Sequence, residues 1–186
     1  MRFARGRNSE GDFLSFCWPM NIHLLRHGIA AAIGQENNFR DELRALTPEG
    51  IAKMRQAALG LKRLQIDFEV IASSPLIRAR ETAEIVAEAL KFRQPLDEWD
   101  ELVPEGAVDA VLRRLHDFRE CRSVLLVGHQ PSIGCIASYL VFGDARVSLP
   151  FKKGAVFCLQ ANDPPPWAAE LLWMLPSRML RQIAES

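Results

Sequence analysis

Short apolar runs alternate along this chain with longer stretches in which apolar residues recur every three or four positions. The short runs predict strands at residues 21–25, 68–72, 123–127, 155–160 and 170–175. The longer stretches predict helices at 47–64, from Ser74-Pro75 to about Leu90, at 108–115, at 133–140 and at 177–184. Strands that alternate with helices indicate an α/β fold, a three-layer sandwich around a mostly parallel central sheet.

Two of the helix starts combine a hydroxyl residue with a proline. Thr47-Pro48-Glu49 offers a capping side chain, a proline suited to the first turn and an acidic residue near the positive end of the helix. Ser74-Pro75 repeats the cap and the proline. We therefore expect helices to begin at both places, and a loop between residues 29 and 46.

Two segments of the chain lack the pattern of strands and helices. Residues 1–19 carry early arginines and a short apolar patch without a small-residue cleavage site, which argues against a signal peptide. We interpret 1–19 as a disordered or mis-started extension, and 20–186 as one domain, since this length suits one hydrophobic core. The proline run 164–166 predicts a turn or an extended linker.

Composition narrows the functional classes. Apolar residues make up 48% of the chain, as in a globular protein, and 23 basic residues balance 23 acidic ones. This balance argues against nucleic acid as a partner, and no apolar run approaches the roughly 20 residues that span a membrane. The four cysteines lie apart, which favours buried free thiols and a cytoplasmic location.

Candidate chemistry gathers where strands are predicted to end. Arg26 and His27 follow the first strand, His129 follows the third, and Arg78 lies early in the helix after the second. The carboxyl ends of parallel strands meet at one sheet edge, so we expect these four side chains to lie together. A neutral imidazole can attack a phosphoryl group, and guanidinium groups can hold its oxygens. No metal-site motif or P-loop is present in the sequence, so we expect no metal and no cofactor.

Both histidines also have plainer interpretations. A single strand-end histidine such as His27 is often structural or simply exposed. His129 could cap the following helix, whose positive end disfavours the imidazolium, although a bound phosphate would favour it.

Several segments of the chain resemble the histidine phosphatase superfamily, which has the phosphoglycerate-mutase-like fold, over about Asn21 to Leu175. The resemblance lies in Leu24–Gly28, Leu46–Gly50, Ser73–Thr82 and Val127–His129. The small size and the sequences Gly128–Ser132 and Phe151–Gly154 are similar to the SixA-type phosphohistidine phosphatase branch.

This resemblance implies a role for each matched residue. His27 would be the phosphorylated nucleophile, and Arg26, Arg78 and His129 would complete the phosphate pocket. In the SixA-type branch an arginine before the first helix also reaches the site, which corresponds to Arg44 here. An aspartate three residues earlier corresponds to Asp41. The alternative for Arg44 and Asp41 is a solvated charged loop.

Many members of the superfamily place a general acid after the second helix. The candidates here are Glu98, Asp100, Glu101 and Glu105, and the sequence does not choose among them. The SixA-type branch resembles this chain in having no obvious acid. A phosphoramidate on histidine has a better leaving group than an ester, and so depends less on an acid. Lys152-Lys153 could extend the positive rim, or could protect a sheet edge.

Three functional hypotheses follow. The first is a metal-independent phosphatase that removes phosphate from phosphohistidine on a signalling protein, with a histidine phosphotransfer-like domain as partner. The second is a phosphomonoesterase that acts on a small phosphorylated metabolite and uses one of the four carboxylates as acid. The third is a phosphate-binding sensor or interaction module without turnover.

Overall fold

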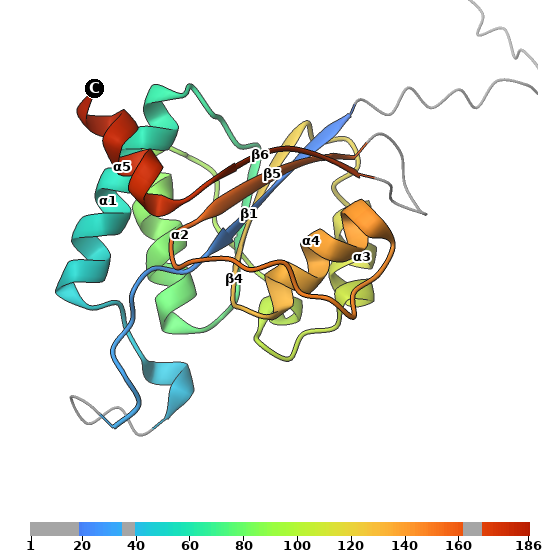
Figure 1. The fold of residues 1–186 in the computed structure, drawn as a ribbon, viewed down its shortest axis with the longest axis horizontal. Helices are drawn as coiled ribbons and strands as arrows, with labels where there is room; N and C mark the ends of the chain where they lie inside the picture. The colour runs from blue at the N-terminus through green and yellow to red at the C-terminus, as the bar shows by residue number, and fades with distance from the viewer. Residues whose placement is uncertain (1–18, 35–39, 162–168) are drawn as a thin grey trace, which may run out of the picture.

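The computed structural model describes residues 19–34, 40–161 and 169–186, and Figure 1 shows their arrangement. The strands are β1 (Met20–Arg26), β2 (Val70–Ser73), β3 (Asp97–Glu98), β4 (Ser123–Gly128), β5 (Val156–Ala161) and β6 (Ala169–Leu175). The helices are α1 (Pro48–Arg63), α2 (Ile77–Leu90), α3 (Val108–His116), α4 (Ser132–Phe142) and α5 (Ser177–Glu185). Two 3-10 turns, η1 (Asp41–Leu43) and η2 (Asp100–Leu102), precede α1 and α3.

The described strands form one six-stranded sheet in the order β3-β2-β4-β1-β5-β6. Strands β3, β2, β4 and β1 run parallel, whereas β5 and β6 are antiparallel to their neighbours. Arg26 pairs with Gly128, and Ser73 pairs with Val127. The carboxyl ends of β1, β2 and β4 therefore lie at one edge, as expected for a mostly parallel sheet.

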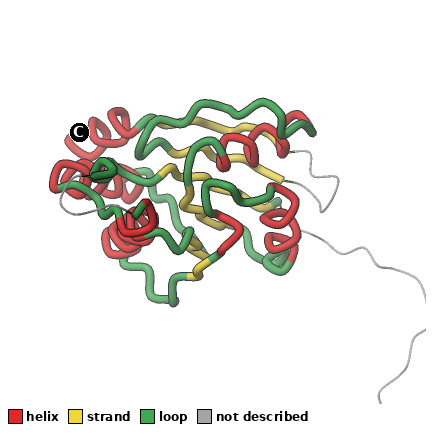
Figure 2. The backbone as a smooth tube through the Cα atoms, turned by 90° about the horizontal axis from the view of Figure 1, so that it is seen from below, coloured by secondary structure: helices red, strands yellow, loops and turns green. Residues whose placement is uncertain are grey.

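Helices cover both faces of this sheet, which gives the predicted three layers (Figure 2). Along β1, Leu24 packs in the core beneath α3 and α4, and Leu25 packs in the core beneath α1, α2 and α5. In β4, Leu126 packs in the same core as Leu24, and Val127 packs in the same core as Leu25. Because β4 lies between β2 and β1 and is covered on both faces, its central residues are all apolar.

The start of α1 is confirmed and the start of α2 is corrected. The Thr47 hydroxyl accepts the backbone N–H of Gly50 at 3.0 Å, with proline at the first helical position. The prediction for Ser74-Pro75 was wrong, because α2 begins two residues later at Ile77 without a side-chain cap. The Ser74 hydroxyl instead contacts a histidine at the sheet edge, described below.

Some expectations concern segments that the structure does not describe. Of the proposed extension 1–19 only Pro19 is described, and Cys17 and the prolines 164–166 lie outside the described residues. The described cysteines are unpaired; Cys158 is buried, whereas Cys121 and Cys135 are only half-buried. In the part of the chain that is described, no helix has both the length and the apolar character needed to cross a membrane.

Candidate active site

The four residues expected to lie together meet at the carboxyl edge of the sheet. Arg26 ends β1 and His27 follows it, His129 follows β4, and Arg78 lies in the first turn of α2. The two imidazole rings contact each other, with centroids 4.9 Å apart. His27, His129 and Arg78 are all buried. The strand-end pattern thus predicted the location of these side chains correctly.

The His27 ring is oriented by its neighbour. Its Nδ1 lies 2.7 Å from the backbone oxygen of Gly28. A carbonyl oxygen can only accept, so Nδ1 carries the hydrogen and Nε2 keeps its lone pair. Burial, followed by electrostatic interaction with His129, Arg78 and Arg26, lowers the pKa of His27 to about 3. The unprotonated Nε2 is therefore available as a nucleophile across the neutral pH range.

The His129 ring is held through one nitrogen and has no described partner at the other. Its Nε2 lies 2.9 Å from the Ser74 hydroxyl, whose oxygen also accepts the backbone N–H of Leu76 at 3.3 Å. Nδ1 is buried, and no described residue bonds to it. Burial and then the Arg78 charge lower the pKa of His129 to about 3. If the serine donates to Nε2, a neutral ring carries its hydrogen on Nδ1, where a phosphoryl oxygen can accept it.

The two arginines are held by backbone oxygens. Arg26 donates from Nη1 to the carbonyl of Phe151 at 2.6 Å, and Arg78 donates from Nη1 to the carbonyl of Asp41 at 2.7 Å. The Nε atoms of Arg26 and Arg78 are buried without a partner among the described residues. Buried donors without partners are costly, so these groups favour an anion at this place.

The segment between β1 and α1 brings Asp41 and Arg44 to the same edge. In Figure 1 its described parts project from the sheet beside α1. The backbone at the start of this segment pairs with the backbone at its end, at Ala30 and Leu46. Asp41 Oδ2 accepts from Arg78 Nη2 at 2.8 Å, and Asp41 Oδ1 accepts from Arg44 Nε at 2.8 Å. Asp41 therefore contacts Arg78, and Arg44 contacts Asp41. Neither side chain is exposed to solvent without a partner.

The remaining predicted residues lie around this centre. Lys152 and Lys153 are both exposed. Partial burial, followed by the charges of Arg26, Arg44 and Arg78, lowers the pKa of Lys153.

Among the described residues, none of the four candidate acids forms a hydrogen bond or an ion pair with either histidine ring. Glu101 pairs with Arg114 at 3.0 Å, and Glu98 lies 4.0 Å from Arg80. Asp100 is exposed. The Glu105 charge acts on Arg78, which makes Glu105 the candidate with a visible electrostatic link to the site.

Sequence reasoning missed several positioning contacts. The fully buried Thr82 hydroxyl accepts the backbone N–H of Gly28 at 3.1 Å and donates to the carbonyl of Arg78 at 2.6 Å. Ser74 and Thr82 both lie in segments that resemble the superfamily, which was a usable signal. The carbonyl of Phe151 gave no signal, because any residue type can supply a backbone oxygen.

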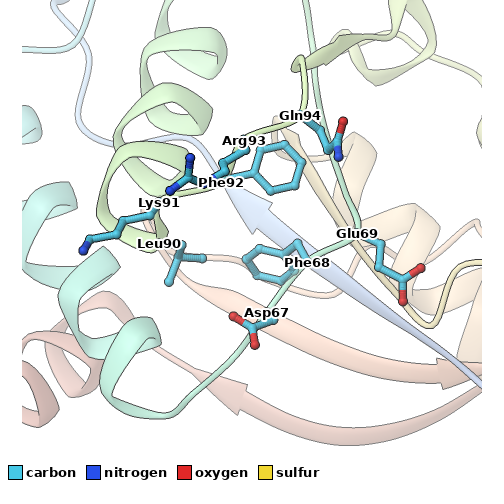
Figure 3. A pocket seen from close by; sticks show the side chains of 8 residues that line it. All are labelled: Asp67, Phe68, Glu69, Leu90, Lys91, Phe92, Arg93 and Gln94. Atoms are coloured by element: carbon cyan, nitrogen blue, oxygen red, sulfur yellow. The ribbon is translucent and has the colours of Figure 1, made fainter.

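A separate pocket of about 440 Å³ lies at the opposite edge of the sheet (Figure 3). Its walls come from Asp67, Phe68 and Glu69 before β2 and from Leu90–Gln94 after α2. The backbone N–H of Glu69 bonds to the oxygen of Ser123, which marks the amino ends of the strands. This pocket contains none of the predicted site residues.

Known proteins resemble this chain in sequence and in structure. A profile of the histidine phosphatase superfamily (branch 1) matches residues 22–104. An uncharacterized protein of Picosynechococcus sp. is 35% identical over 145 residues, 77% of this chain and 86% of that protein. Phosphohistidine phosphatase SixA of Escherichia coli is 31% identical over 127 residues, 67% of this chain and 76% of its own. The structure of the protein histidine phosphatase SixA complexed with tungstate superposes with a TM-score of 0.76 at 26% identity, covering 86% of this chain and 98% of the other.

The α/β fold, with two histidines and two arginines at the carboxyl edge of its sheet, is typical of proteins that catalyse phosphoryl transfer. The sequence relatives make the assignment specific: this chain belongs to the histidine phosphatase superfamily. Membership and the similarity to SixA support phosphatase activity.

Proposed function

We propose that this protein removes phosphate from phosphohistidine on a signalling protein, through a covalent phosphohistidine formed at Nε2 of His27. The observation that carries the proposal is the hydrogen bond from His27 Nδ1 to the Gly28 oxygen. It directs the lone pair of Nε2 away from the backbone while Arg26, Arg78 and His129 supply donors for the phosphoryl oxygens. We expect the reaction to need neither a metal nor a cofactor.

The reaction has two balanced steps. In the first, Nε2 of His27 forms a bond to phosphorus as the bond between phosphorus and the substrate nitrogen breaks. The substrate ring carries a proton on its other nitrogen, so it leaves as a neutral imidazole. In the second, water attacks the phosphohistidine and releases inorganic phosphate with the free His27. The ring is positively charged while it carries phosphate, and the Gly28 oxygen stabilises its N–H.

The position of the carboxylates favours a phosphoramidate as substrate. Within the described residues no carboxylate hydrogen bonds to the His27 or His129 ring. An ester leaves as an alkoxide and needs a proton donor, whose contribution is roughly 10²–10⁴ in rate. A phosphorylated histidine ring that is protonated on its other nitrogen already carries the proton it needs, and it leaves as a neutral imidazole. The similarity to phosphohistidine phosphatase SixA supports the same substrate class.

The test compares two substrates and two proteins. A histidine phosphotransfer domain phosphorylated on histidine and an aryl phosphate are each incubated with the wild-type protein and with His27→Ala. We expect faster turnover of the phosphorylated domain, and no turnover of either substrate by the variant. Mass spectrometry of protein quenched during turnover should find phosphate on His27. Turnover of the aryl ester alone would disprove the protein substrate, and phosphate on another residue would disprove the mechanism.

A phosphomonoesterase for a small metabolite is the second candidate, because the Glu105 charge acts on Arg78. Its test is a panel of sugar and nucleotide phosphates with Ala replacing each of Glu98, Asp100, Glu101 and Glu105. If one replacement alone slows ester hydrolysis, that residue is the acid. A binding module without turnover predicts no phosphate release from any substrate, so His27-dependent release excludes it.

A further inference from the structure

A carboxylate inside the site occupies donors that a phosphoryl group needs. Asp41 accepts two hydrogen bonds from Arg78, one to its backbone oxygen at 2.7 Å and one to Oδ2 at 2.8 Å. Its Oδ1 accepts from Arg44 Nε at 2.8 Å and lies 2.7 Å from Arg44 Nη2. One aspartate thus binds two guanidinium groups in the manner of a bound anion.

The charges around Asp41 keep it ionised. Burial would raise the pKa of its carboxyl group, but hydrogen bonds and charges from Arg78 and Arg44 outweigh this effect and lower the pKa. Among the described residues, Asp41 is the one acidic side chain that hydrogen bonds to Arg26, Arg44 or Arg78. It therefore supplies a hydrogen-bonded negative charge at a cationic site.

Exposure decides which partner can move. The Arg78 side chain is 3% exposed and lies in the first turn of α2, whereas the Asp41 side chain is 42% exposed and lies on the short turn η1. A phosphoryl group on Arg78 would place its negative oxygens close to the Asp41 carboxylate. Because like charges repel, the carboxylate can turn into solvent while the arginine stays in place.

We infer that Asp41 is an internal anion that competes with phosphate for Arg78 and Arg44. The Asp41 carboxylate binds both arginines when the site is empty. It turns away from them when a phosphoryl group binds, and it returns as inorganic phosphate dissociates. The competition weakens phosphate binding, because the apparent affinity falls with the fraction of protein whose arginines are free. This inference rests on the proposed function only in that the site binds a phosphoryl group.

Calorimetric binding of inorganic phosphate to the whole protein tests this inference without turnover. Asp41→Asn removes the charge at nearly constant size, and we expect phosphate to bind about two- to fivefold more tightly, the range for a partly exposed ion pair. Glu42→Gln is the matched control, since Glu42 lies in the same turn and, among the described residues, bonds only to the exposed Arg40. It should leave phosphate affinity unchanged. Equal or weaker binding by Asp41→Asn would overturn the inference.

Two further measurements separate competition from simple positioning of Arg78. In turnover assays the inhibition constant for phosphate should fall in Asp41→Asn by the same factor as the dissociation constant, and KM should fall with it. A positioning role would raise both. In a crystal structure with phosphate, the Asp41 carboxylate should lie beyond 3.5 Å from Arg78 Nη2, and retention of that bond would contradict the inference. Failure to act on phosphohistidine would disprove the proposed substrate and leave these binding results unaffected.

Discussion

At the scale of single residues, one backbone oxygen decides which atom of His27 can react. Because the Gly28 carbonyl accepts from Nδ1, the lone pair stays on Nε2, and because burial lowers the pKa of the ring to about 3, it is not lost to a proton. His129 is neutral in the empty site for the same reason. The two rings can therefore share a small volume without charge repulsion.

The low pKa values predict a flat pH profile for the free enzyme. A base whose pKa is lowered to about 3 stays unprotonated above that pH, so kcat/KM should not fall between pH 8 and pH 5 through protonation of His27. An ordinary histidine would lose activity about tenfold per pH unit below roughly 6.5. The measurement is kcat/KM for an aryl phosphate, corrected for ionisation of the substrate. A tenfold fall per unit that begins near pH 6.5 would contradict the assignment.

Thr82 acts through Gly28 and Arg78, so it is a positioning residue. Thr82→Val leaves the buried N–H of Gly28 without an acceptor, which costs about 1–3 kcal/mol and loosens the carbonyl that orients His27. We expect kcat to fall by roughly tenfold or more, with KM changed less. Thr82→Ser keeps the hydroxyl and should recover most of kcat. Equal losses in both variants would show that the methyl group, and not the hydrogen bonds, matters.

At the scale of elements, α1 packs against the site segment at its first turn and against α5 near its other end. Its start lies against the segment after His27, where Thr47 donates its backbone N–H to the oxygen of Ile29 at 2.9 Å. A Cβ on Gly50 would overlap that same carbonyl oxygen. Near its other end, a Cβ on Gly60 would overlap the carbonyl oxygen of Leu180 in α5. Glycine is thus required at two close approaches of backbone to helix.

These two glycines give a matched pair of variants. Gly50→Ala and Gly60→Ala should each destabilise the protein by about 1–3 kcal/mol, because the backbone must shift to admit a methyl group. Only Gly50→Ala displaces Ile29 and the segment that carries Asp41 and Arg44, so only this variant should also reduce kcat/KM in the folded protein. Urea denaturation and kinetics below the midpoint separate the two effects. Equal kcat/KM for both variants would contradict the proposed connection.

At the scale of the whole molecule, burial of histidine makes stability depend on pH. His23 of β1 packs between Phe68 and Trp173, with ring centroids at 5.0 and 5.5 Å, and burial lowers its pKa to about 4. In the unfolded chain it titrates near its ordinary value. Between about pH 4 and 6.5 the unfolded state therefore binds more protons than the folded state, so stability rises with pH in this window and levels off above it.

Replacement of His23 by phenylalanine should change this slope. His23 contributes up to about 1.4 kcal/mol per pH unit to the free energy of unfolding within the window. His23→Phe should lower the slope by about that amount, whatever its effect on stability at pH 7. Chemical denaturation at half-unit intervals from pH 4.5 to 7.5 measures it. An unchanged slope would show that His23 is already charged in the folded protein.

Hydrophobic periodicity predicted most of the architecture, because long strands and helices must bury one face or both. It could not predict β3, whose two residues Asp97–Glu98 carry no apolar signal and form a strand by pairing with Ala72 and Ser73. The hydroxyl-plus-proline signal misplaced the start of α2, since a tertiary contact with His129 engages the Ser74 hydroxyl. Strand ends located the four central side chains, whereas contacts through backbone oxygens depend on tertiary structure.

One such contact has a consequence for synthesis of the chain. Arg26 is held by the carbonyl of Phe151, 125 positions later, and its own carbonyl accepts the N–H of Gly154. A nascent chain that has completed β1, β2 and β4 already presents both histidines but cannot yet fix Arg26. Phosphate binding should therefore appear only after the segment before β5 has left the ribosome and docked, so activity reports that this segment has reached the end of β1.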